Sequence, residues 1–460
     1  MLIKHLNKNT VKRIYMKQHL FGTNGIRSIV GQAPLTFINL PLLGLAIGQS
    51  IINHYGKNAQ VLLAHDTRIS CSFIKSALGC GLSLHQLTIY DANVLPTPAG
   101  CRLVQQNQDF KTGIIITASH NPYYDNGIKI IDENGVKIDE KEETEIEHLF
   151  EKIKNSPISY DTLGSIHYWP YAADRYIATI CSLFPAQFLD GITIALDCAN
   201  GATSKLAPHI FRKLGATVIP IHNAPDGINI NEQCGTQHTQ DLVNTVLAHN
   251  ADIGFAFDGD GDRLVIITKD GIKKDGDDML ALLASNPPYD QETTIIGTIM
   301  SNQGLEQWLA SHKKKLIRCA VGEPAVWKHL KKHNLTLGGE PSGHIIMTNY
   351  LSSSDAIYTA LRLLGIIITT NNWKLETFTH YPQINLNIPV TVKNPLDKPP
   401  LKNIIEAAQT ELPDGRLIIR YSGTEPLLRV MVEGQDQKKV NQVAQTVAHK
   451  LKKELSTSGE

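Results

Sequence analysis

Short apolar runs rich in β-branched residues alternate with amphipathic stretches along most of the chain. Runs at 61–66, 192–197 and 294–300 each lead into a stretch with helical periodicity and then into a second apolar run. This alternation predicts strand–helix–strand units that build mostly parallel sheets. The three starts are unevenly spaced, which favours three related α/β domains over a solenoid.

The pattern changes after the proline-rich segment 394–400. A helix at 401–412, strands at 416–420 and 428–433, and a final helix to about residue 455 predict a smaller C-terminal α+β domain. A chain of 460 residues agrees with three or four domains. We expect domains over 1–155, 156–255, 256–372 and 373–460, with mixed, mostly parallel sheets in the first three.

Composition excludes several classes of protein. Lys plus Arg and Asp plus Glu are 44 each, so the charge balance does not favour nucleic acid or an anionic membrane as a partner. The seven cysteines are scattered without a Cys-x-x-Cys pair, which is typical of reduced thiols in a cytosol. No apolar stretch approaches the length of a membrane span. These features predict a cytoplasmic protein.

The strongest candidate chemistry is the loop Asp258-Gly-Asp-Gly-Asp-Arg263, which lies between two apolar runs. Glycines at alternate positions let the backbone fold so that the three carboxylates converge, and converging carboxylates require a cation. An EF-hand is excluded, because its sixth and twelfth positions would hold Arg263 and Lys269. An acidic, solvated turn is the plainer alternative. We predict that Asp258, Asp260 and Asp262 bind Mg²⁺.

Ser119 follows the apolar run 113–117, at the strand end where open α/β sheets place active sites. A hydrolase nucleophile is disfavoured, because Gly-x-Ser-x-Gly is absent and the adjacent His120 tends to point away from the serine. A phosphorylated Ser119 would share Mg²⁺ with the acidic loop. Lys129 would serve as a general acid/base if its surroundings lower its pKa.

Two further loops offer ligand-binding groups. The segment 338–344 contains Glu340, Ser342 and His344, of which the glutamate and the serine suit sugar hydroxyls. The segment 420–429 predicts a phosphate cradle made of Arg420, Ser422, Gly423, Thr424 and Arg429. The polar loop 225–236 has no role that its composition reveals.

These loops, in this order, resemble the α-D-phosphohexomutases over essentially the whole chain. The matching motifs are Phe21–Arg27, Thr117–Pro122, Asp258–Arg263, Gly339–His344 and Arg420–Arg429. The resemblance implies four domains around a central cleft, with one loop from each. It also implies a role at each matching position: Ser119 as phosphoserine and Mg²⁺ ligand, Arg27, Lys129, His344 and His120 in catalysis, and Arg263 with the sugar and phosphate loops in substrate binding.

The segments 420–433 and 225–235 are similar to the bacterial members of this family that act on an amino sugar. This likeness implies reversible conversion of glucosamine 6-phosphate to glucosamine 1-phosphate, feeding UDP-N-acetylglucosamine and cell-wall synthesis. The intermediate and activator would be glucosamine 1,6-bisphosphate or glucose 1,6-bisphosphate. A mutase for glucose or mannose phosphates, a catalytically silent sugar-phosphate sensor and a phosphatase are the alternatives. The implied partner is a small sugar phosphate, and a homodimer is the oligomeric state to test.

Overall fold

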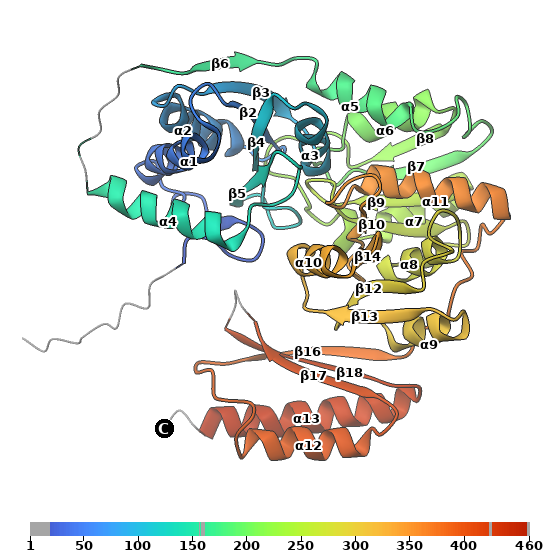
Figure 1. Cartoon of the computed structure of the whole chain (residues 1–460). Helices are drawn as coiled ribbons and strands as arrows, with labels where there is room; N and C mark the ends of the chain where they lie inside the picture. The colour runs from blue at the N-terminus through green and yellow to red at the C-terminus, as the bar shows by residue number, and fades with distance from the viewer. Residues whose placement is uncertain (1–18, 156, 158–161, 423–425, 458–460) are drawn as a thin grey trace, which may run out of the picture.

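The computed structural model describes residues 19–155, 157, 162–422 and 426–457 (Figure 1). Four sheets follow one another along the chain, each with its own helices. Three sheets are mixed and the last is antiparallel. The predicted four-domain α/β architecture with mixed, mostly parallel sheets is confirmed.

The first sheet has the order β1-β5-β4-β2-β3-β6. β2, β3, β4 and β6 run parallel, and β5 pairs antiparallel with both β4 and β1. The strands are β1 (Ile26–Ile29), β2 (Gln60–His65), β3 (Thr88–Val94), β4 (Phe110–Ile116), β5 (Asp125–Asp132) and β6 (Ser165–Tyr168). The helices are α1 (Asn39–Tyr55), α2 (Cys71–Ser83), α3 (Thr97–Gln106) and α4 (Glu140–Lys154).

The second sheet has the order β11-β10-β9-β7-β8. β7, β8 and β9 are parallel, whereas β10 pairs antiparallel with β9. Its elements are α5 (Ala172–Cys181), β7 (Thr193–Asp197), α6 (Leu206–Lys213), β8 (Thr217–Ile221), the 3-10 helix η1 (Gly235–Gln237), α7 (Gln240–His249), β9 (Ile253–Phe257), β10 (Leu264–Thr268) and β11 (Lys273–Lys274).

The third sheet has the order β13-β12-β14-β15, with β15 antiparallel to β14. Its elements are α8 (Gly276–Ala284), β12 (Thr294–Thr298), α9 (Gln303–Ser311), β13 (Lys315–Cys319), α10 (Glu323–His333), β14 (Leu337–Gly339), β15 (Ile345–Met347) and α11 (Ala356–Thr370). The fourth sheet pairs β16 (Gln383–Pro389) and β17 (Arg416–Tyr421) with a central β18 (Leu427–Glu433). Figure 1 shows α12 (Leu401–Glu411) and α13 (Gln437–Thr457) together on one face of that sheet.

The first three sheets share a hydrophobic core, and the fourth has its own. One hydrophobic cluster runs from Leu62 in β2 to Leu375 beyond α11, so it spans the first three sheets. The fourth sheet packs with its two helices around a separate core. The loops of the first three sheets are therefore held by one shared hydrophobic core, whereas the fourth domain packs around its own core.

Two sheets extend past the expected domain boundaries. β6 lies beyond residue 155 and completes the first sheet, and β9, β10 and β11 carry the second sheet to Lys274. The boundaries themselves stay predictions. Among the residues that the structure describes, no helix is both long and apolar enough to cross a membrane.

Candidate active site

The three aspartates of the acidic loop converge at the tight connection between β9 and β10. The antiparallel register pairs Phe257 with Leu264, so the intervening residues must turn back sharply, and Gly261 takes a φ of +75° there. Asp258, Asp260 and Asp262 are 0%, 1% and 4% exposed. Each offers a carboxylate oxygen, and these oxygens lie within 4.8 Å of one another.

The protein neutralises this cluster unevenly. Burial opposes the charged form of Asp262, yet Lys129 and His344 lower its pKa well below the ordinary value. Burial, followed by repulsion from Asp262 and Asp260, holds the pKa of Asp258 well above its ordinary value. In the described part of the chain, Asp260 Oδ1 and Asp262 Oδ1 are buried and receive no hydrogen bond. Buried carboxylate oxygens without donors fit a hard divalent cation such as Mg²⁺.

Ser119 lies directly against these acids. It follows β4 in a left-handed conformation (φ +52°), and its N–H donates to Thr117 Oγ1 at 2.9 Å. Its own Oγ donates to Asp258 Oδ2 at 2.7 Å, and the residue is 2% exposed. The serine and the acidic loop, 139 residues apart in sequence, therefore meet as a nucleophile beside a candidate cation site.

Lys129 projects from β5 into the same cluster. Its Nζ donates to Asp260 Oδ2 at 2.7 Å and to Asp262 Oδ2 at 3.0 Å. Burial alone would lower the pKa of Lys129, but the two carboxylates together raise it above its ordinary value. The prediction that the surroundings lower the pKa of Lys129 is therefore wrong. In this arrangement Lys129 is an ammonium that partly neutralises the acids.

His344 from the third domain completes the cluster. Its Nδ1 lies 3.6 Å from Asp262 Oδ1 and its Nε2 lies 3.3 Å from Glu323 Oε1. Burial opposes the charged form, yet Glu323 and Asp262 raise the pKa of His344 well above its ordinary value. In the same loop, Glu340 accepts the N–H of Gly322 at 2.8 Å, and Ser342 is exposed.

Three more predicted residues border the acids. In the described part of the chain, the buried Nε atoms of Arg27 and Arg263 make no hydrogen bond, so both guanidinium groups retain a donor. Burial, then Arg263 and Arg27, lower the pKa of His120 to about 3. His120 is therefore neutral near pH 7. Its Nδ1 lies 3.4 Å from Ser119 Oγ, so the expectation that His120 points away from the serine is wrong.

The predicted phosphate loop lies on the fourth sheet. Arg420 on β17 and Arg429 on β18 are direct cross-strand partners, and both line a pocket that also includes Met300 and Asn387. Like charges placed opposite each other repel, and a bound anion would relieve this repulsion. The Ser422 N–H donates to the Leu427 carbonyl at 2.8 Å. Gly423 and Thr424 lie outside the described residues.

Arg68 has a role that the sequence argument missed. Its side chain is fully buried, its Nε pairs with Asp66 Oδ2 at 2.9 Å, and its terminal nitrogens donate to backbone carbonyls of the serine loop. Those carbonyls belong to Ser119 (2.9 Å), Asn121 (2.8 Å), Asp125 (3.0 Å) and Pro122. Arg68 thus holds the backbone from Ser119 to Asp125, on the carboxyl side of the nucleophile. The sequence feature that could have identified Arg68 is its position just after β2, the strand that neighbours β4 in the sheet.

Three other residues also support the site without having been predicted. Asn231, in the polar loop 225–236, donates to the carbonyls of Ser119 (2.9 Å) and Asn121 (3.1 Å). Thr97 donates to Asp260 Oδ2 at 2.6 Å, and Glu323 holds His344. Each lies far from its partner in sequence, so no local motif could have identified it.

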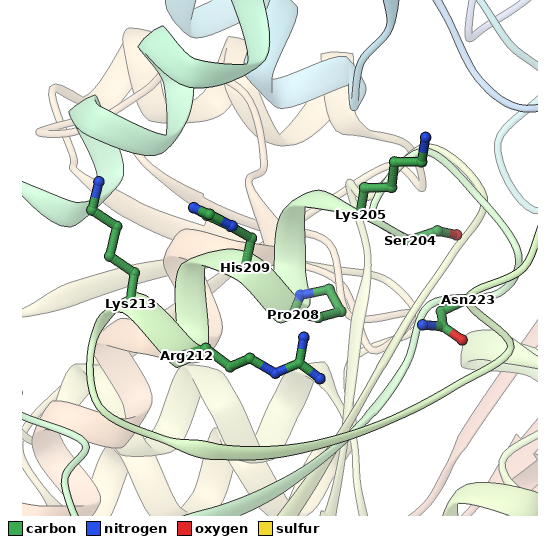
Figure 2. A pocket seen from close by; sticks show the side chains of 7 residues that line it. All are labelled: Ser204, Lys205, Pro208, His209, Arg212, Lys213 and Asn223. Carbon is green, nitrogen blue, oxygen red and sulfur yellow. The ribbon is translucent and has the colours of Figure 1, made fainter.

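A basic pocket lies elsewhere, along α6. Figure 2 shows Lys205 directly before this helix and His209, Arg212 and Lys213 on it, with their side chains spread apart rather than converging on one point. The residues that line the pocket include no carboxylate. It therefore lacks the arrangement of nucleophile and acids found around Ser119.

Comparison with known proteins agrees with this site. Four domain profiles of the phosphoglucomutase/phosphomannomutase family match the chain in order: α/β/α domain I over 18–157, domain II over 174–271, domain III over 275–383 and the C-terminal domain over 386–450. The chain belongs to this family. The predicted resemblance to phosphohexomutases is confirmed.

Several relatives at 38–40% identity are named phosphoglucosamine mutase. A phosphoglucosamine mutase of Coxiella burnetii (strain CbuG_Q212) is 39% identical over 444 residues, which cover 94% of this chain and 98% of that protein. Phosphoglucosamine mutases of Nitrosococcus oceani (40% identical; 95% and 98% covered) and Pseudoalteromonas translucida (38%; 93% and 96%) are similarly related.

Solved structures of family members share the fold. A phosphoglucomutase/phosphomannomutase family protein from Burkholderia thailandensis superposes with a TM-score of 0.76 at 23% identity, covering 95% of this chain and 98% of that one. An N-acetylphosphoglucosamine mutase from Aspergillus fumigatus, in complex with GlcNAc-6P and magnesium, has a TM-score of 0.63 at 15% identity, with 94% and 95% covered.

Proposed function

We propose that this chain is an isomerase that converts glucosamine 6-phosphate to glucosamine 1-phosphate and back, through a phosphorylated Ser119. The observation that carries the proposal is the contact between Ser119 Oγ and Asp258 Oδ2, at 2.7 Å, inside a buried three-aspartate cluster. A serine in that position would carry its phosphoryl group next to the cation that the acids require.

The reaction comprises two phosphoryl transfers with opposite directions. The sugar O1 attacks the phosphorus of phosphoserine 119, the bond from phosphorus to Ser119 Oγ breaks, and a 1,6-bisphosphate forms. The bisphosphate turns round in the site. Ser119 Oγ then attacks the phosphorus at position 6, which leaves glucosamine 1-phosphate and restores the phosphoserine.

The residues around Ser119 hold charge and protons during these steps. Arg27 and Arg263 keep donors for the transferring oxygens. The attacking hydroxyl must lose a proton, and neutral His120, whose Nδ1 lies 3.4 Å from Ser119 Oγ, could accept it. Lys129, as an ammonium, would instead offset negative charge beside the transferring group. Asp258, Asp260 and Asp262, with a phosphoryl oxygen on Ser119, would hold Mg²⁺, which would offset charge on the transferring group.

Substrate orientation would depend on the third and fourth domains. Glu340 and Ser342 would contact sugar hydroxyls, while His344, between Asp262 and Glu323, would stabilise charge during transfer. The facing pair Arg420 and Arg429, together with the loop that joins their strands, would hold whichever phosphate is not reacting. A single cradle that accepts either phosphate explains how one site processes both ends of the bisphosphate.

The choice of sugar follows the relatives at 37–40% identity that are named phosphoglucosamine mutase. The description of the matching profiles favours a second candidate, a mutase for glucose or mannose phosphates. A homodimer, a cytoplasmic location and the expected central cleft stay predictions.

A coupled assay with the phosphorylated, magnesium-loaded protein tests the proposal. Glucosamine, glucose and mannose 1-phosphates are compared at equal concentration, and glucosamine 1-phosphate should give the highest kcat/KM. Ser119→Ala should abolish turnover, while Ser76→Ala, at an exposed serine on α2, should keep it. Absence of turnover with all three sugars would refute the mutase, and preference for glucose or mannose would reassign its substrate.

A further inference from the structure

A second cluster of metal-binding residue types lies in the second domain, apart from the acidic loop. Asp197 ends β7, His222 follows β8 and Cys234 directly precedes η1. β7 and β8 are parallel neighbours in which Asp197 pairs with Ile221, so His222 stands one residue beyond the partner of Asp197. A carboxylate oxygen, an imidazole nitrogen and a thiol therefore come within 4.8 Å of one another.

We propose that Asp197, His222 and Cys234 form a site for a zinc-type divalent cation. One oxygen, one imidazole nitrogen and one sulfur are the donor types that Zn²⁺ combines, whereas Mg²⁺ and Ca²⁺ prefer oxygen alone. Three protein ligands leave the fourth tetrahedral position to water.

The spacing of the donors suits such an ion. His222 Nδ1 lies 3.1 Å from Asp197 Oδ2, but the two atoms are not aligned as a hydrogen bond. Two ligands each about 2.0–2.1 Å from a tetrahedral metal stand about 3.4 Å apart. The imidazole and the carboxylate are thus already separated by nearly the distance that a shared metal imposes.

The groups around the cluster support the same interpretation. Nε2 of His222 faces Asp241 Oδ2 at 3.3 Å on the far side of the ring. Histidines that bind a metal through one nitrogen usually donate the other N–H to a carboxylate. If Nε2 carries the proton, Nδ1 keeps a lone pair on the side of the ring nearer Asp197, where it would bind a cation.

Burial distinguishes this cluster from an exposed acidic turn. Asp197 is 0% exposed and Cys234 is 1% exposed, while the His222 side chain, at 24%, leaves a route for the ion. Burial, then Asp197, raise the pKa of the Cys234 thiol to about 12. The metal-free thiol is therefore protonated at neutral pH, and metal binding must release that proton.

The site is connected to the nucleophile through its own loop. Asp197 Oδ2 also accepts the Gly235 N–H at 2.9 Å, and three residues before Cys234 the side chain of Asn231 holds the Ser119 carbonyl. A metal bound at Cys234 would anchor the loop that carries Asn231.

Titration of the full chain with Co²⁺, in excess Mg²⁺, tests the proposal. Oxygen ligands alone give no thiolate-to-Co²⁺ charge-transfer absorption, so this signal reports Cys234 and not the acidic loop. One equivalent of Co²⁺ should produce the absorption, and Zn²⁺ should displace it. Cys234→Ser should abolish it, while Cys198→Ser, at a neighbouring buried thiol outside the cluster, should keep it.

Asp241→Asn provides a milder variant, because Asp241 is 58% exposed and its replacement should not disturb folding. Loss of the carboxylate behind His222 should weaken Co²⁺ binding by about 10- to 100-fold. The proposal is overturned if the wild-type protein gives no charge-transfer absorption, or if the absorption persists in Cys234→Ser. The cluster would then be a His–Asp ion pair beside an inert thiol.

Discussion

Replacing Arg68 by lysine tests whether the serine loop is held in place by a buried guanidinium. Arg68→Lys keeps the positive charge beside Asp66, but one ammonium replaces a planar group that contacts four backbone carbonyls. A lysine cannot reach all of these acceptors, and we expect at least two of the backbone hydrogen bonds to be lost.

Two such bonds contribute about 2–3 kcal/mol at about 1–1.5 kcal/mol each. If this free energy is lost from the catalytic conformation of the serine loop, the fraction of molecules in that conformation falls roughly 30- to 150-fold. About 1.4 kcal/mol corresponds to a factor of ten. The loss should appear in kcat. The KM for the sugar phosphate should change little, because Arg68 is buried behind the loop.

Steady-state kinetics of Arg68→Lys, with thermal melts to establish that the variant folds, measure this effect. Arg212→Lys is the matched control, because Arg212 is an exposed arginine with one long bond to the Val218 carbonyl, and it should behave as wild type. A folded Arg68→Lys protein with wild-type kcat would refute the positioning role.

Three further predictions concern the cation site, the phosphate cradle and pH. Asp258→Asn should lower kcat/KM by about 10²-fold or more and weaken Mg²⁺ binding measured by calorimetry, while exposed Asp270→Asn should do neither. Arg420→Gln should raise KM roughly 10- to 150-fold through loss of one charge-assisted hydrogen bond, and unchanged KM would remove Arg420 from the cradle. Burial, then Asp275, raise the pKa of Asp277 to about 8, above an unfolded value of about 3.9. Between these values the folded chain keeps a proton that the unfolded chain has lost, so stability falls as pH rises. The melting temperature of Asp277→Asn should therefore rise relative to that of wild type from about pH 5 to about pH 8. A difference in melting temperature that stays constant over this range would contradict the prediction.

The sequence allowed the strands and the nucleophile to be predicted together, because both depend on local patterns. Apolar runs place Ser119 at the end of β4 and Asp258 at the end of β9, and the carboxyl ends of parallel strands are where such groups gather. Three converging acids require a cation, and a phosphorylated Ser119 could share that cation. This requirement alone predicts that the serine loop and the acidic loop lie together.

The supporting contacts could not be predicted in this way. Arg68, Asn231 and Glu323 act through long-range contacts that the packing of the first three domains creates. The protonation of Lys129 was also beyond local reasoning, because the raised pKa depends on Asp260 and Asp262 converging on its Nζ. Composition describes which groups are available, but only the fold decides how their charges are balanced.

The most direct test of the central claim follows the phosphoryl group itself. Protein carrying ³²P on its serine, with the label located by peptide mass spectrometry, is mixed with unlabelled glucosamine 6-phosphate for less than one turnover. We predict that the label resides on Ser119 and moves to the bisphosphate and then to the sugar monophosphates. Label on another residue, or release as inorganic phosphate without transfer to sugar, would contradict the account.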